Sequence, residues 1–217
     1  KFMYRSAYTY SDEIIFYFDF VGNKYVASGG SLAWRINNPG LVRSHSHFSR
    51  RHGSIGSCGR YAIFARPDDG RKALSAWVHS KKYYDSTLKV IAEHYSPNAP
   101  NAFLNQLCSL AKISPTTKVK LLTKHELNRL LASIEKLCGY GSIGNEKLSL
   151  LPKIIAKIEH VKSQEDSFLI ADNVVLSKTE AIQWILSHRL DAVIIHEQNN
   201  KTHLRSRPHH GFQKINV

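Results

Sequence analysis

Apolar residues recur at every second position near the start of the chain, where three phenylalanines alternate with Tyr17 and Asp19 between residues 16 and 20. This spacing is typical of a β-strand with one buried face. Gly22-Asn23 then gives a turn signal. The pattern predicts a β-hairpin over residues 7–27.

The following segment has no regular hydrophobic period. Residues 28–60 are rich in Gly, Ser, Asn and His, a composition that predicts a loop. The short apolar run Tyr61-Ala62-Ile63-Phe64 predicts one further strand.

Helical spacing of apolar residues begins near residue 68 and predicts four helices. Proline ends the second helix, and Thr123 with Glu126 forms a capping box at the start of the fourth. The predicted helices run over residues 68–80, from Ser86 to the prolines Pro97 and Pro100, after Asn101, and from Thr123 to Gly139.

The pattern changes again beyond residues 140–150, whose Gly, Ser and Asn content indicates a linker. A strand, a hairpin, a helix that opens with the capping box Ser177 and Glu180, and a final hairpin are predicted in that order. The sequence therefore predicts an α+β fold with a mainly helical domain over residues 1–140 and a small β-β-β-α-β-β module over residues 150–217.

Composition is that of a globular protein, with 42% hydrophobic and 22% charged residues. No run reaches the roughly 20 apolar residues of a membrane span, and no basic segment precedes an apolar one, so neither a membrane span nor a signal peptide is expected. The three cysteines, Cys58, Cys108 and Cys138, are too few and odd in number for a disulfide framework.

Charge narrows the choice of partner. Thirty Lys and Arg against 17 Asp and Glu give a net charge of +13, which favours a polyanion. Nucleic acid, anionic lipid and the bacterial cell wall all fit this charge, and a solvated basic surface fits it as well.

One stretch carries recognisable motifs. Residues 29–40 read GGSLAWRINNPG, residues 53–64 read GSIGSCGRYAIF, and Asp69-Gly70 and Tyr95-Ser96-Pro97 follow. Over residues 28–139 the chain resembles phage-associated and secretion-system proteins with the patterns AWRNNNPGN, GRFAIFP, EAG and YAP. These are regarded as cell-wall-degrading or virion proteins, and their layout is similar to that of the lysozyme superfamily.

The resemblance implies a lysozyme-like domain and a peptidoglycan hydrolase that cuts the glycan strand, as muramidases, glucosaminidases and lytic transglycosylases do. It also implies an antibacterial toxin, either a type VI secretion effector or a phage lysin. Such a protein is made in the bacterial cytoplasm and acts in the periplasm or wall of the target cell. The expected partners are peptidoglycan, a cognate immunity protein and a secretion carrier, with nucleic acid as an alternative. The C-terminal module resembles short modules appended to secreted effectors.

The chain departs from the family pattern at several positions. Ile36 and Leu41 replace asparagines, and Cys58 stands where an acid is common. Acid-containing pairs of the family are replaced by Pro100-Asn101 and Cys138-Gly139. These differences leave a non-catalytic binding module for wall or nucleic acid as an alternative.

Glycoside cleavage needs a protonated carboxylic acid and, in most families, a second carboxylate. Glu13 is the only glutamate upstream of Asn37, and it adjoins Ile14 and Ile15, an apolar setting that suits a general acid. Asp19 is the alternative. A solvated charge at a strand edge is the competing interpretation of Glu13.

Substrate contacts are expected in the two motifs. The amides of Asn37 and Asn38 can bind acetamido groups, and Gly40 allows a sugar to approach the backbone. A tight turn explains the same three residues equally well. The remaining candidates for contact with the glycan are Trp34, Arg60 and Tyr61.

A different chemistry is suggested by Cys58, which lies near His45, His47 and His52. A cysteine–histidine pair such as Cys58 with His52 suits a peptidoglycan amidase or peptidase. The histidines also have a zinc-like spacing, but no fourth ligand is evident, so neither a metal nor a cofactor is expected.

Overall fold

The computed structural model describes residues 4–11, 13–44, 47–141, 149–159, 166–170, 174–197, 201–206 and 213–216. The fold is α+β, as predicted. The chain forms two compact units, one of residues 1–16 with 27–147 and the other of residues 17–26 with 148–217.

Three strands open the chain: β1 (Tyr4–Ser11), β2 (Ile14–Asp19) and β3 (Lys24–Ser28). Together with β6 (Ser149–Leu150) they pair in the order β1-β2-β3-β6. The predicted turn at Gly22-Asn23 is confirmed, because Gly22 has φ +86° between β2 and β3. Strand β1 begins before the predicted hairpin.

The predicted loop over residues 28–60 is wrong in part. It contains two single-turn helices, α1 (Leu32–Arg35) and α2 (Phe48–Arg51), and a strand, β4 (Ser54–Cys58). Strand β4 pairs antiparallel with the predicted strand β5 (Tyr61–Phe64). A helix of one turn is too short to show a hydrophobic period, so the pattern cannot reveal it.

The four predicted helices of the first unit are confirmed. Thr123 accepts a hydrogen bond from the Glu126 backbone and Glu126 returns one, so the predicted capping box is present. The helical elements, including two that the pattern missed, are α3 (Pro67–Val78), α4 (Lys81–Tyr84), α5 (Leu88–Tyr95), α6 (Pro100–Ala111), the 3-10 turn η1 (Val119–Leu121) and α7 (Lys124–Leu137).

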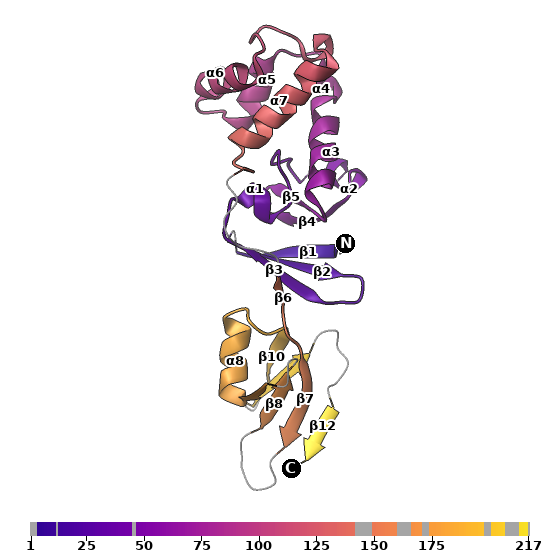
Figure 1. The fold of residues 1–217 in the computed structure, drawn as a ribbon, viewed down its shortest axis with the longest axis vertical. Coiled ribbons are helices and arrows are strands. Elements are labelled where there is room, and N and C mark those ends of the chain that lie inside the picture. The colour runs from indigo at the N-terminus through magenta and orange to yellow at the C-terminus, as the bar shows by residue number, and fades with distance from the viewer. Residues whose placement is uncertain are drawn as a thin grey trace. The chain divides into compact units, whose positions relative to one another are not determined.

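These helices enclose the core of the first unit, with α5, α6 and α7 side by side (Figure 1). Strand β5 and helix α3 contribute Phe64 and Leu74, which are completely buried. Each such side chain contributes roughly 1.5–3 kcal/mol through burial. The core therefore holds β5 and α3 together. The segment between α1 and β5 packs against these two elements.

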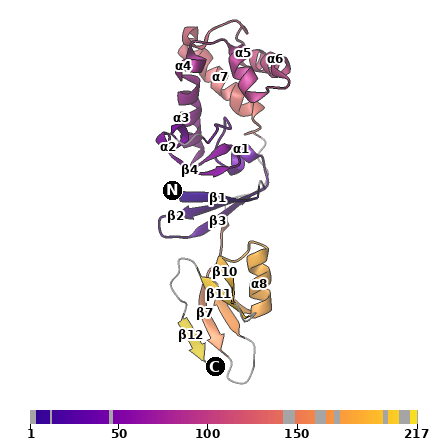
Figure 2. The same cartoon turned by 180° about the vertical axis from the view of Figure 1, so that it is seen from behind.

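The second unit is a small α+β module. Strands β7 (Ile154–Glu159), β8 (Ser167–Ile170) and β9 (Val175–Ser177) precede helix α8 (Lys178–Leu186), and strands β10 (Ala192–His196), β11 (Thr202–Ser206) and β12 (Gln213–Asn216) follow it. The sheets have the orders β12-β7-β8-β9 and β10-β11. Helix α8 packs against strands β8, β9 and β10. Figure 2 shows it beside β10.

The predicted order of strands and helix in this module is confirmed, and β12 is an addition that pairs parallel with β7. The capping box of Ser177 and Glu180 is also present. The predicted turns at residues 172–173 and 199–200 lie outside the described residues. None of the helices in the described ranges combines the length and apolar character that crossing a bilayer requires.

Candidate functional site

The first motif folds as a tight bend after α1. Ser31 caps this helix by accepting a hydrogen bond from the Trp34 backbone. Asn37 then has φ +52°, in the left-handed region that asparagine tolerates better than most residues. Its side-chain amide donates hydrogen bonds to the carbonyl oxygens of Phe64 and Ala65, at 3.1 and 3.2 Å. Asn37 therefore ties the bend to the end of β5.

Asn38 lies deeper in the same bend and is completely buried. Its amide nitrogen donates to the carbonyl oxygens of Val42 and Ala62, at 2.9 and 2.8 Å. Its amide oxygen accepts from the Val42 backbone N–H at 2.8 Å. Both donors and an acceptor lone pair of Asn38 are thus bonded to backbone groups, which gives this side chain a structural role.

Gly40 completes the bend and is also buried. Its carbonyl oxygen accepts a hydrogen bond of 2.6 Å from the Tyr95 hydroxyl. A Cβ at this position would lie 2.6 Å from the side chain of Leu74, so α3 packs directly on the glycine. Close approach of the protein's own helix, rather than of a sugar, explains the glycine here.

The other predicted contact residues lie around this bend. Trp34 is half-buried in α1, and Tyr61 is half-buried at the start of β5. Arg60 is exposed in the β4–β5 turn, with its guanidinium 5.7 Å from the centre of the Tyr61 ring. The rings of Trp34 and Tyr61 therefore lie partly at the surface, and the guanidinium of Arg60 lies at the surface.

The two candidate acids are placed differently. Glu13 is exposed in the turn between β1 and β2. Asp19 is only 8% exposed and accepts hydrogen bonds from the backbone N–H groups of Val21 and Asn23, as well as from the side chains of Asn23 and Tyr25. Burial alone would raise the pKa of Asp19, but these hydrogen bonds outweigh it and hold the pKa below its ordinary value. Such an acid is ionised at neutral pH and stabilises the β2–β3 turn.

The cysteine–histidine alternative depends on β4 and α2. Cys58 ends β4 and is 2% exposed, so its sulfur has little access to a substrate. His52 is half-buried and its ring lies 4.4 Å from that of Phe48. His45 lies outside the described residues.

Among the described residues of the first unit, two of the cavities are lined by none of the residues Glu13, Asp19, His52, Cys58, Trp34, Asn37, Asn38, Gly40, Arg60 and Tyr61 that were predicted as catalytic or substrate-binding. The first, which we call the aromatic pocket, has a volume of about 520 Å³. It is lined by Arg43, His47, Phe48, Trp77, Ser80, Lys82, Tyr83 and His94.

Aromatic rings form the wall of this pocket. The Trp77 ring lies 3.9 Å from that of Tyr83 and 4.7 Å from that of His94, measured between centres. The Tyr83 hydroxyl is 3.1 Å from Nδ1 of His94. Helices α3, α4 and α5 supply these three rings, so the tertiary packing of three separate helices builds the wall.

Two cations border the rings. Arg43 donates a hydrogen bond of 3.4 Å to the His94 carbonyl oxygen, which places its side chain at the pocket. The ammonium of Lys82 lies 5.1 Å from the centre of the Tyr83 ring. An aromatic wall with two positive charges suits a ring-containing ligand that carries anionic groups.

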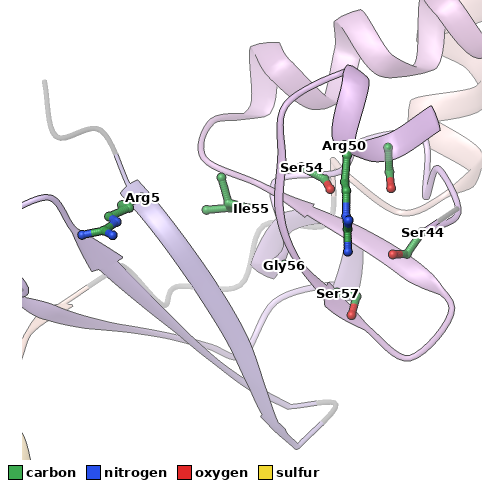
Figure 3. Close-up of a pocket in the computed structure, with 8 residues that line it drawn as sticks. Arg5, Ser44, Arg50, Ser54, Ile55, Gly56 and Ser57 are labelled. Atoms are coloured by element: carbon green, nitrogen blue, oxygen red, sulfur yellow. The ribbon is translucent and has the colours of Figure 1, made fainter. Parts of the chain in front are cut away.

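The second cavity, which we call the serine–arginine pocket, has a volume of about 590 Å³ (Figure 3). It is lined by Arg5, Ser44, Ser49, Arg50, Ser54, Ile55, Gly56 and Ser57. Among the residues that the structure describes, no carboxylate lines either pocket.

The periodicity of α3 identifies Trp77 only as part of an apolar face, and Tyr83 and His94 carry no motif. The signal for this site in the sequence is the density of aromatic and basic residues between positions 77 and 95. Within the described ranges, no three His, Cys, Asp or Glu side chains gather closely enough to hold a metal ion. Comparison with models of protein families gave no match, and comparison with curated protein sequences gave none either.

Proposed function

We propose that the first unit binds peptidoglycan and that the aromatic pocket is its glycan-contacting site. The observation that carries the proposal is the combination of Trp77, Tyr83 and His94 in one wall with the cations Arg43 and Lys82 at its border. Sugar rings can pack on aromatic faces, and the two cations match the carboxylates of the wall's stem peptides.

Binding rather than cleavage is proposed, because bond cleavage by the lysozyme route requires a carboxylic acid beside the sugar. The lining of the aromatic pocket supplies hydroxyl, imidazole and cationic groups instead. The net charge of +13 adds a long-range attraction to the anionic wall.

The test is co-sedimentation of the full chain with purified peptidoglycan sacculi. Lys82→Glu reverses a charge at the pocket, and we expect it to weaken binding roughly fivefold or more. Lys81→Glu is the matched control: Lys81 is the exposed neighbour in the same helix and does not line the pocket. Equal losses in both variants would show that only overall charge matters and would contradict the proposal.

Cleavage of the glycan strand by a lysozyme-like domain is the second candidate, and the motif resemblance over residues 28–139 favours it. Mass spectrometry of the same sacculi after incubation tests it directly. Released disaccharides that disappear in Glu13→Gln would establish a hydrolase and displace the binding proposal. Freed stem peptides that disappear after alkylation of Cys58 would instead establish the amidase alternative.

A further inference from the structure

The serine–arginine pocket is the strongest unassigned feature of the molecule. Helix α2 supplies Arg50, strand β4 supplies Ser54 and Ser57, and the segment before α2 supplies Ser44. In Figure 3 the hydroxyls of these three serines lie around the Arg50 guanidinium. Strand β1 adds Arg5 to the lining, and in Figure 3 its guanidinium points away from Arg50.

Four polar side chains of this pocket are available to a ligand. Within the part of the chain that the structure describes, the side chains of Arg50, Ser44, Ser54 and Ser57 form no hydrogen bond or ion pair with another residue. Unbonded hydroxyls and guanidinium groups gathered at one cavity can all donate hydrogen bonds to the same anion.

Close packing of strands β1 and β4 positions the residues that line the cavity. Gly56 lies on β4 where β1 crosses closely, and a Cβ at Gly56 would lie 2.2 Å from the Ala7 carbonyl oxygen. Thr9 also donates a hydrogen bond of 2.9 Å to the Ser57 carbonyl oxygen. The two strands are therefore held together at a fixed distance, which places Arg5 and Ser57 on the same cavity.

We propose that this pocket binds the phosphate group of an organic phosphate ester. Arginine fits a tetrahedral oxyanion with two parallel hydrogen bonds, and the serine hydroxyls can bind its remaining oxygens. At about 590 Å³ the cavity has the size of a site for a small organic ligand, so it has room for the alcohol part of the ester, with Ile55 as its apolar contact.

The proposal is independent of the aromatic pocket, since the two sets of lining residues do not overlap. Calorimetric titration of the full chain tests the proposal and distinguishes the possible sources of the phosphate group. The three ligands are inorganic phosphate, glycerol 3-phosphate and a glycerol-phosphate diester. We expect both esters to bind more tightly than inorganic phosphate. A preference for the diester would indicate a phosphodiester polymer as the source, and a preference for glycerol 3-phosphate would indicate a small metabolite.

Matched variants make the test specific. Arg50→Gln should weaken ester binding at least about tenfold, because it removes a charged hydrogen-bond donor. Arg51→Gln is the control, since Arg51 is the exposed neighbour in the same helix and does not line the pocket. Ser57→Ala should weaken binding without changing the net charge.

Circular dichroism of each variant establishes that it is folded. Equal weakening by Arg50→Gln and Arg51→Gln, or the absence of ester binding to the unmodified chain, would overturn the proposal. If the unmodified chain binds the esters but does not bind sacculi, the result contradicts only the function proposed for the aromatic pocket.

Discussion

Asn38→Ala is the substitution whose effect the structure defines most sharply. The side chain is completely buried and forms three hydrogen bonds to backbone groups of Val42 and Ala62. A neutral hydrogen bond contributes about 1 kcal/mol net, and a buried partner left without a bond costs about 1–3 kcal/mol. We therefore expect Asn38→Ala to lower the free energy of unfolding of the first unit by about 3 kcal/mol.

Urea unfolding followed by tryptophan fluorescence measures this change. A Trp184→Phe background removes the tryptophan of the second unit, so that the signal comes from Trp34 and Trp77 in the first. The midpoint should fall without a change in the denaturant slope. For a chain of this size, about 3 kcal/mol corresponds to a fall in melting temperature of roughly 6–12 °C.

Asn105→Ala is the control, because Asn105 is exposed within α6 and its removal should change the unfolding free energy by less than about 0.5 kcal/mol. A loss below about 1 kcal/mol for Asn38→Ala would refute the structural role assigned to the amide. It would reopen the possibility that Asn38 serves a ligand.

Three further outcomes are expected. Tyr95→Phe should cost about 1 kcal/mol in urea unfolding through loss of the hydrogen bond to the Gly40 carbonyl oxygen, with the ring contacts retained. Because the pKa of Asp19 is lowered on folding, its contribution to stability is present above the unfolded pKa near 3.8 and is lost as pH falls through the lower folded pKa. Asp19→Asn should therefore destabilise at pH 7, and its difference from the unmodified chain should shrink below about pH 4 in pH-dependent unfolding. Burial raises the pKa of the Cys138 thiol to about 12, so iodoacetamide at pH 8 should label this residue at least about tenfold more slowly in the folded chain than in urea, as followed by peptide mass spectrometry.

The sequence predicts the longer elements of this fold well because each carries a local signal. The capping boxes at Thr123 and Ser177 mark where α7 and α8 begin, and both are present. Gly139 ends the α7 region with φ +79°, as its position after the apolar face indicates. These signals depend on residues within about one helical turn, so they can be recognised without knowledge of tertiary contacts.

The candidate site was less accessible to sequence reasoning. The two asparagines after α1 suggested a surface that binds sugars, but Asn38 bonds to Ala62, a residue that lies far along the chain. The aromatic pocket likewise depends on Trp77 and His94 meeting across two different helices. Residues that are far apart in the sequence and meet only in the folded chain produce no hydrophobic periodicity, and no spacing rule relates their positions.

The pairing of β3 with β6 has a consequence for synthesis of the chain on the ribosome. Tyr25 pairs with Leu150 and Val26 with Ser149. This edge of β3 therefore has no pairing partner until residues 27–148 and then β6 itself have been synthesised. At about 5–20 residues per second this delay is on the order of ten seconds. During that time an apolar strand edge is open to pairing with other nascent chains, and slower translation would lengthen the exposure.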